Sequence, residues 1–269
     1  MGLSTLNQIT CDLLGPGDGT ENAGLGNQMF QIAAITSLAH DNGAEAVFPQ
    51  ILEPKYGGYQ DNIFHKVPTE IVHPVGIWHK SGQSHFTYEE PIYLNHTIYS
   101  GYYQSEKYFK HNRKLILDLF TLKLADLSWV SVQNPACSIH IRRGDYLKLQ
   151  DHHPTQPLSY YQEAMRYVLA KHQVNHFLVF SDDIEWCKEK LPQTDKFLPL
   201  IFVENEPDYV DLLLMSMCDH NIIANSSFSW WGAWLNQNPE KIVVAPKKWF
   251  GPAKQLDTKD LLPEEWIQI

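Results

Sequence analysis

Two adjacent arginines give the sequence its strongest chemical signal. Arg142 and Arg143 stand in the segment His-Ile-Arg-Arg-Gly-Asp-Tyr at residues 140–146, directly after an apolar run that predicts a buried strand. A guanidinium presents a rigid set of N–H donors that matches phosphate oxygens, and it stays charged when partly buried. The pair therefore predicts a phosphate-binding site. The alternative is a structural ion pair with Asp145 or another nearby carboxylate.

A glycine-rich segment nearer the N-terminus also suits an anion. Residues 23–29 read Ala-Gly-Leu-Gly-Asn-Gln-Met and lead into a predicted helix over residues 28–41. Backbone N–H groups at the start of a helix favour an anion, although a tight turn explains the glycines equally well. Met29 stands where a dinucleotide-binding fingerprint has its third glycine, and no Gly-Lys-Ser/Thr follows, so neither that fingerprint nor a P-loop is present.

A third segment, Asn-Ser-Ser-Phe-Ser-Trp-Trp at residues 225–231, follows another apolar run. Ser226 or Ser227 can cap the helix that comes next, and the same geometry would present hydroxyl and amide groups to a phosphate. The two tryptophans are expected in the core.

Acidic residues complete the candidate groups. Asp182, at the end of a predicted strand, either forms a capping box with Glu185 or binds a ribose or base. Asp211 and Asp219 flank an apolar helix and are expected on its solvated surface. No cluster has metal-ligand spacing, so no metal or other cofactor is expected. Arginine and backbone donors would then have to stabilise a phosphate leaving group.

The elements that position these groups are clearest in the second half of the chain. Apolar runs predict strands at 137–142, 176–181, 197–203, 221–225 and 241–245, and helical patterns fall between them at 158–172, 183–191, 207–217 and 227–237. Strict alternation predicts a parallel sheet covered by helices on both faces, with ligands beyond the carboxyl ends of the strands. Residues 142–146, 182–183 and 225–228 are thus expected on one rim.

The first half is less regular. The helix over residues 28–41 is expected to end at Asn42-Gly43, with a strand following at residues 45–48. A strand-to-helix unit is predicted at 96–104 and 105–120, whereas residues 53–95 show only weak periodicity. A domain boundary is expected near residues 126–135.

Composition narrows the classes of function. Among 269 residues, 31 are acidic and 21 basic, so the net charge of −10 argues against general binding to nucleic acid or anionic lipid. Four scattered cysteines fit neither a zinc site nor a disulfide framework and are expected to be reduced thiols. The sequence shows no signal peptide and no apolar stretch long enough to span a membrane. We expect a cytoplasmic protein that touches membranes at most peripherally.

Taken in order, these motifs resemble the alpha-1,2-fucosyltransferases. The matching segments are GLGNQMFQIAA (24–34), GYYQSEKYF (101–109), HIRRGDY (140–146), FSDDIEWCK (180–188) and NSSFSWWGAWL (225–235). The resemblance implies an inverting, metal-independent enzyme that transfers fucose from GDP-fucose to the 2-hydroxyl of a terminal galactose in glycan or O-antigen synthesis. It also implies a glycosyltransferase B fold, with two Rossmann-like domains facing across a cleft: residues 1–130 on the acceptor side and residues 131–269 binding GDP-fucose.

The resemblance also implies roles for individual residues. Arg142 would hold the diphosphate, Arg143 would lie nearby or be structural, and His140 and Asp145 would shape the loop. Asn27 would lie near the donor phosphate or the acceptor. The remaining residues expected to bind GDP-fucose are Gly26, Gln28, Asp182 at the nucleoside, Asp211 at the guanine, and Ser226, Ser227 and Phe228 at the phosphates and fucose.

The sequence departs from the family near its start. Residues 16–22 look inserted, and Ala23 replaces the first glycine of the family's loop. Animal members carry an N-terminal membrane anchor that is not seen here, so a bacterial-type enzyme is expected. The catalytic base is not identified, and Asp145, Asp18 and Glu21 are candidates. The alternatives are a transferase with the same donor but another acceptor or linkage, and a non-catalytic glycan- or nucleotide-binding relative.

Overall fold

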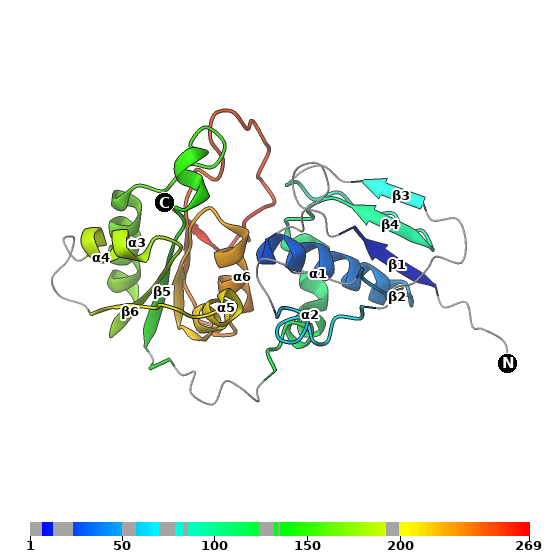
Figure 1. The fold of residues 1–269 in the computed structure, drawn as a ribbon, viewed down its shortest axis with the longest axis horizontal. Helices are drawn as coiled ribbons and strands as arrows, with labels where there is room; N and C mark the ends of the chain where they lie inside the picture. The colour runs from blue at the N-terminus through cyan, green and yellow to red at the C-terminus, as the bar shows by residue number, and fades with distance from the viewer. Residues whose placement is uncertain are drawn as a thin grey trace. The chain divides into compact units, whose positions relative to one another are not determined.

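The computed structural model describes residues 7–12, 24–49, 58–69, 79–82, 86–123, 132–133, 135–191 and 199–269. The chain divides into two compact units (Figure 1). One comprises residues 1–125 and 257–263, and the other comprises residues 126–256 and 264–269. The inserted residues 16–22, with Asp18 and Glu21, lie outside the described residues.

The second unit is built on a six-stranded sheet in the order β10-β9-β8-β5-β6-β7. Every paired neighbour is parallel. The strands are β5 (Ala136–Ile141), β6 (His176–Ser181), β7 (Leu200–Phe202), β8 (His220–Ile222), β9 (Val243–Ala245) and β10 (Ile267–Gln268). The predicted parallel sheet is confirmed, and β10 is an additional strand. The order runs outward from β5 on one side and from β8 on the other, so the topological switch point lies between these two strands.

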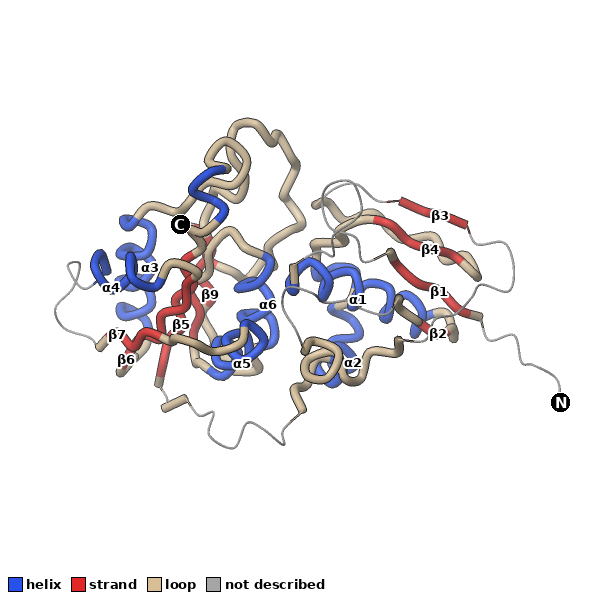
Figure 2. The backbone as a smooth tube through the Cα atoms, viewed as in Figure 1, coloured by secondary structure: helices blue, strands red, loops and turns tan. Residues whose placement is uncertain are grey.

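Helices cover both faces of this sheet, as predicted (Figure 2). They are α3 (Leu158–Lys171), α4 (Ile184–Lys190), α5 (Asp208–Met217) and α6 (Ser227–Leu235). Side chains alternate between the faces of a strand. Ile139 of β5 accordingly joins a cluster with Tyr161 of α3, whereas Ala136 joins one with Leu214 of α5. Apolar burial on both faces thus holds the ends of β5 and β6 in place.

The tryptophans of α6 belong to the core, as predicted. Trp230, Trp231 and Trp234 are each at most 2% exposed. The ring centroids of Trp230 and Trp231 lie 5.2 Å apart, and Trp266 packs at 5.4 Å from Trp230. This aromatic cluster anchors α6, so the position of its N-terminus is set by packing.

The first unit contains a smaller parallel sheet in the order β2-β1-β4-β3. Its strands are β1 (Gln8–Cys11), β2 (Glu45–Ala46), β3 (His79–Gly82) and β4 (Thr97–Ser100), and its helices are α1 (Leu25–Asp41) and α2 (Arg113–Leu119). The predicted helix over residues 105–120 begins instead as two 3₁₀ turns, Glu106–Tyr108 and Lys110–Asn112. Phe109 interrupts them in a non-helical conformation because its fully buried ring packs on Phe30.

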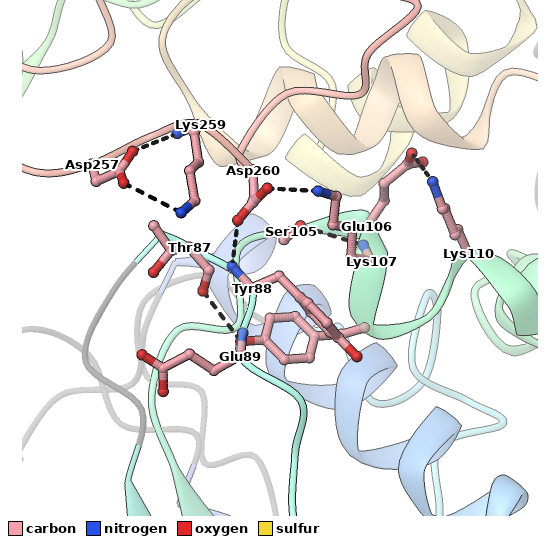
Figure 3. A network of polar contacts seen from close by, with 11 residues as sticks. Thr87, Tyr88, Glu89, Ser105, Glu106, Lys107, Lys110, Asp257, Lys259 and Asp260 are labelled. Atoms are coloured by element: carbon pink, nitrogen blue, oxygen red, sulfur yellow. Dashed lines mark hydrogen bonds and ion pairs between the residues drawn. The ribbon is translucent and has the colours of Figure 1, made fainter.

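A segment near the C-terminus returns to the first unit. Residues 257–263, called here the return segment, were expected in the second domain, but they cluster with the first unit. Asp260 accepts hydrogen bonds from the Tyr88 N–H at 2.8 Å and from Lys107 Nζ at 2.7 Å (Figure 3). Leu261 is 1% exposed. One buried carboxylate and one apolar side chain therefore attach the return segment.

None of the helices in the described part of the chain is both long and apolar enough to cross a membrane.

Replacing Asp260 tests how the return segment is held. Asp260→Ala removes the acceptor for Lys107 and leaves the Tyr88 N–H without its partner, so we expect a loss of about 1–3 kcal/mol in the free energy of unfolding. Asp257→Ala is the matched control: its exposed carboxylate accepts the Lys259 N–H at 3.0 Å and lies 3.8 Å from Lys259 Nζ, so both contacts stay within the return segment. Thermal unfolding of both variants checks this, and equal melting temperatures would contradict it.

Candidate functional site

The predicted rim groups meet where β5, β6 and β8 end. β5 pairs with both β6 and β8, so the loops that follow these strands lie next to one another. The Tyr146 hydroxyl, in the loop after β5, donates to the carbonyl of Asn225 after β8 at 3.0 Å. These groups therefore surround the switch point, where open α/β sheets bind ligands.

Arg142 stands between two carboxylates at this rim. Its Nη2 lies 2.6 Å from Asp145 Oδ1, and its Nη1 lies 2.9 Å from Asp182 Oδ2. Burial alone would lower the pKa of Arg142, but Asp182 and Asp145 raise it above its ordinary value. The guanidinium stays charged and has more N–H donors than these two contacts use. Both predicted roles, ion pairing and anion binding, are thus compatible with its position.

Arg143 has a different environment. Its guanidinium lies over the ring of Trp186, 3.7 Å from the centroid, and its Nε donates to Asp183 Oδ2 at 2.9 Å. Only 15% of its side chain is exposed. The partner of Arg143 is therefore Asp183, whereas Asp145 pairs with Arg142. Stacking and ion pairing make Arg143 part of the loop's framework.

The turn of the loop requires glycine at position 144, because the Asp182 carboxylate lies too close to admit a Cβ atom. A Cβ atom at Gly144 would overlap the carboxylate of Asp182. That carboxylate accepts the Arg143 N–H at 2.8 Å through Oδ1 and binds Arg142 through Oδ2. The capping box predicted for Asp182 and Glu185 is therefore wrong: Asp182 serves the arginine loop, while Glu185 pairs with Lys188 at 2.8 Å.

An aromatic stack supports the loop from its other side. The Tyr146 ring lies 5.4 Å from the Arg142 guanidinium carbon and 5.1 Å from the His153 ring. His153 Nε2 lies 2.8 Å from Lys254 Nζ. Burial, followed by the charge of Lys254, lowers the pKa of His153 to about 4. A neutral His153 therefore accepts from Lys254, which ties residues 249–254 to the arginine loop.

On the α6 side of the rim, Ser226 caps the helix and the nearby His140 is neutral. The Ser226 hydroxyl accepts the Phe228 N–H at 3.3 Å, which confirms the predicted N-cap. Phe228 packs against His140, with ring centroids 5.4 Å apart. Burial and the nearby Arg142 lower the pKa of His140 to about 3, so this imidazole adds no charge at neutral pH. Ser227 begins α6 beside the cap.

Asp211 differs from the sequence-based expectation. A solvated surface was expected, but its Oδ1 is buried and has no hydrogen-bond partner within the described residues. Burial, together with Asp208 and Glu206, raises the pKa of Asp211 to about 7. Asp219 is also engaged, since its carboxylate accepts the Ala136 N–H at 2.8 Å. The half-buried carboxyl of Asp211, with its unpartnered Oδ1, is a candidate for binding a ligand with N–H donors.

The glycine-rich segment of the first unit opens α1. Gly24 is the N-cap residue with φ −58° and ψ 158°, and a Cβ there would meet no atom within 4 Å. A tight turn therefore does not account for Gly24. Gly26 and Gln28 lie in the first turn of α1 and are buried. Asn27 Oδ1 accepts a hydrogen bond from Gln104 Nε2 at 2.7 Å.

Several residues that contact the site lie inside or beside the predicted motifs, but the sequence alone did not assign them a function. Tyr146 lies inside the arginine motif, and Gln104 lies inside the segment 101–109. Asp183 and Trp186, the partners of Arg143, stand beside the predicted Asp182. The only available signal was their position just after predicted strands. Across the part of the chain that the structure describes, no group of three or more His, Cys, Asp or Glu side chains could hold a metal ion.

The chain is similar in sequence to known glycosyltransferases. A family profile described as Glycosyl transferase family 11 matches residues 83–269. The chain is 38% identical over 178 residues to an alpha-1,2-colitosyltransferase of Escherichia coli, covering 63% of this chain and 61% of that protein. It is 27% identical over 236 residues to galactoside alpha-(1,2)-fucosyltransferase 1 of Bos taurus, covering 78% and 63% respectively. The chain thus spans about three fifths of the length of these relatives.

Solved structures show a similar fold. The apo form of POFUT1 superposes with a TM-score of 0.55 at 11% identity, covering 91% of this chain and 99% of that one. The fucosyltransferase NodZ from Bradyrhizobium superposes with a TM-score of 0.50 at 13% identity, covering 85% and 92%. At these identities the likeness concerns the fold alone.

A pair of glycine replacements tests the crowding in the arginine loop. Gly144→Ala forces the Asp182 carboxylate away from both arginine contacts, so we expect a loss of about 1–3 kcal/mol in the free energy of unfolding. Gly24→Ala is the matched control and should leave the melting temperature unchanged, because space and backbone angles there admit a Cβ. A fully stable Gly144→Ala protein would refute this account of the turn.

Proposed function

Because the chain belongs to glycosyl transferase family 11, we propose that it transfers L-fucose from GDP-fucose to the 2-hydroxyl of a terminal galactoside, forming an alpha-1,2 linkage. The observation that carries the donor assignment is Arg142, a charged guanidinium with spare donors at the switch point of a parallel sheet. The acceptor assignment is supported by relatives named galactoside alpha-(1,2)-fucosyltransferases. A relative named for O-antigen biosynthesis supports a role in glycan or O-antigen synthesis.

In the proposed reaction, the acceptor oxygen attacks the anomeric carbon of fucose as the bond to the phosphate oxygen breaks. The bonding electrons leave with GDP, and the fucose passes through a state with oxocarbenium character. Arg142 and the N-terminus of α6 at Ser226 and Ser227 would stabilise the charge that develops on the phosphate. Attack from the face opposite GDP inverts the anomeric centre.

The acceptor hydroxyl must also lose its proton. Asp145 is the described candidate base, but its Oδ1 is held by Arg142 at 2.6 Å. A phosphate that takes the place of Asp145 on Arg142 would release this carboxylate to accept the proton. Asp18 and Glu21 stay candidates, and transfer to the phosphate itself is the alternative. The facing arrangement of the two units across a cleft also stays a prediction.

Product analysis tests the proposal directly. The purified chain is incubated with GDP-fucose and lactose, with and without EDTA, and the product linkage is determined by NMR. Fucose on the 2-hydroxyl of galactose, formed equally with EDTA, is the expected result. Another linkage would refute the acceptor assignment, and a strict requirement for magnesium would refute metal independence. GDP binding without hydrolysis or transfer would indicate a non-catalytic relative.

A second donor is favoured by one observation. The alpha-1,2-colitosyltransferase shares 38% identity with this chain, more than the 27% shared with the bovine fucosyltransferase. Colitose is fucose without its 3-hydroxyl group, so the same phosphate and guanine contacts would serve both donors. A competition between the two GDP-sugars, measured as the ratio of kcat/KM, decides which one the chain uses.

Replacing each arginine by lysine separates the two candidate roles. Arg142→Lys keeps the charge but loses the fork of donors, so we expect turnover to fall on the order of a hundredfold with little change in melting temperature. Arg143→Lys loses the stacking on Trp186 and the bond to Asp183, so we expect mainly a lower melting temperature. Normal turnover in a folded Arg142→Lys protein would end the phosphate assignment.

Asp211→Asn is expected to stabilise the protein and abolish guanine recognition. The folded-state pKa of about 7 exceeds the unfolded value near 3.9, so the native state holds an extra proton between these values. Unfolding free energy therefore decreases as pH rises through this window, and Asn removes that dependence. Asp211→Asn should thus gain stability relative to the parent chain between pH 5 and pH 8.

Repeating the unfolding measurements with added GDP tests the role of Asp211 in guanine recognition. A guanine presents N–H donors that a carboxylate can accept, so GDP should raise the melting temperature of the parent chain but not of Asp211→Asn. Asp208→Asn serves as control, because it removes a neighbouring negative charge and keeps the Asp211 carboxyl. An unchanged GDP response in Asp211→Asn would show that the guanine binds elsewhere.

A further inference from the structure

In the first unit, Gln104 contacts Asn27 from the segment that follows the neighbouring strand β4. Asn27 lies in the first turn of α1, which follows β1, and Gln104 lies four residues beyond the end of β4. β1 and β4 are paired and parallel, and they are the two central strands of the order β2-β1-β4-β3. The two amides therefore meet at the carboxyl edge of this sheet, the edge at which such sheets bind ligands.

The hydrogen bond between them has a defined polarity. Gln104 Nε2 donates to Asn27 Oδ1 at 2.7 Å, and Gln104 is only 5% exposed. With its oxygen engaged, Asn27 presents its Nδ2 group, which is a donor only. Nothing in the described residues accepts a hydrogen bond from Asn27 Nδ2. In this orientation Asn27 presents an N–H donor, and an amide turned the other way would present an acceptor.

We infer that Gln104 is a positioning residue that keeps the Asn27 amide turned to donate a hydrogen bond to a substrate oxygen. This inference rests on the proposed function. The oxygen belongs either to the donor phosphate, where negative charge develops as fucose leaves, or to the acceptor sugar. A donor fixed in advance costs no reorganisation when that charge develops, whereas a freely rotating amide does.

Two substitutions of Gln104 reverse or remove its hydrogen bond to Asn27 and change the size of the side chain little. Gln104→Glu offers only acceptor atoms, so Asn27 must turn its Nδ2 toward residue 104 and present its oxygen to the substrate. Gln104→Met removes the bond and leaves the amide free to rotate. We expect kcat to fall by about tenfold in Gln104→Met and further in Gln104→Glu, because misplaced groups cost about this much or more.

Separate measurement of kcat and of the KM for GDP-fucose distinguishes a positioning role from charge repulsion. A change of orientation lowers kcat at nearly constant KM, whereas simple charge repulsion by the new glutamate would raise the KM for GDP-fucose and spare Gln104→Met. Gln60→Glu is the matched control: Gln60 Nε2 also donates within the first unit, to the carbonyls of Phe64 and Val67. It should lower the melting temperature and leave kcat unchanged.

Hydrolysis of GDP-fucose without an acceptor identifies which oxygen Asn27 serves. If it is the phosphate oxygen, hydrolysis and transfer should fall together in Gln104→Glu. If it is an oxygen of the acceptor, transfer should fall while hydrolysis is retained. Wild-type kcat in a folded Gln104→Met protein would overturn the inference for either oxygen.

An NMR measurement on the ligand-free chain keeps the inference separate from the proposed function. The Asn27 side-chain amide resonances, assigned by their loss in Asn27→Ala, should show no hydrogen-bonded proton in the parent chain and one in Gln104→Glu. An unchanged amide spectrum in Gln104→Glu would refute the positioning role even if the enzyme transfers fucose. A parent chain with no transferase activity but with this spectral change would refute the proposed function alone.

Discussion

The carboxylate of Asp182 is the contact on which the arginine loop depends. One oxygen accepts the backbone N–H of Arg143, and the other binds the guanidinium of Arg142. The same carboxylate occupies the space that a side chain at Gly144 would need. A single side chain at the end of β6 thus determines the conformation of three consecutive residues after β5. Since β5 and β6 are held by apolar packing on both faces, the geometry is built into the sheet.

The carboxylates at the rim set the electrostatics of the two arginines. Asp182 and Asp145 raise the pKa of Arg142, Asp183 orients Arg143, and burial, helped by Arg142, lowers the pKa of His140 so that it is neutral. Arg142 pairs with Asp145, whose side chain is 55% exposed. Arg143 instead lies over the Trp186 ring and is 15% exposed. The two neighbouring arginines therefore stand in different environments, one more open and one packed into the fold.

The two units arrange polar groups by the same rule. In each parallel sheet, the two central strands bring together groups from loops that are distant in sequence: Asn27 with Gln104 in one unit, and Tyr146 with the Asn225 carbonyl in the other. In both, a hydrogen bond between the loops that follow these strands orients a side chain and leaves its other donors or acceptors unused. Asp211 is the exception, since its buried oxygen has no such partner and its pKa is raised accordingly.

Local sequence patterns were enough to predict most elements of the second unit and the motifs that follow its strands. Alternating apolar runs predicted β5, β6, β8 and β9 and the helices between them, and short-range rules predicted the Ser226 cap and the buried tryptophans. Local patterns did not predict which carboxylate pairs with which arginine, or that Asp211 Oδ1 is buried without a partner. They also did not predict that Gln104 reaches Asn27 or that residues 257–263 join the first unit. The reason is range: periodicity and caps depend on residues a few positions apart, whereas these contacts depend on the order of strands, which local pattern does not encode.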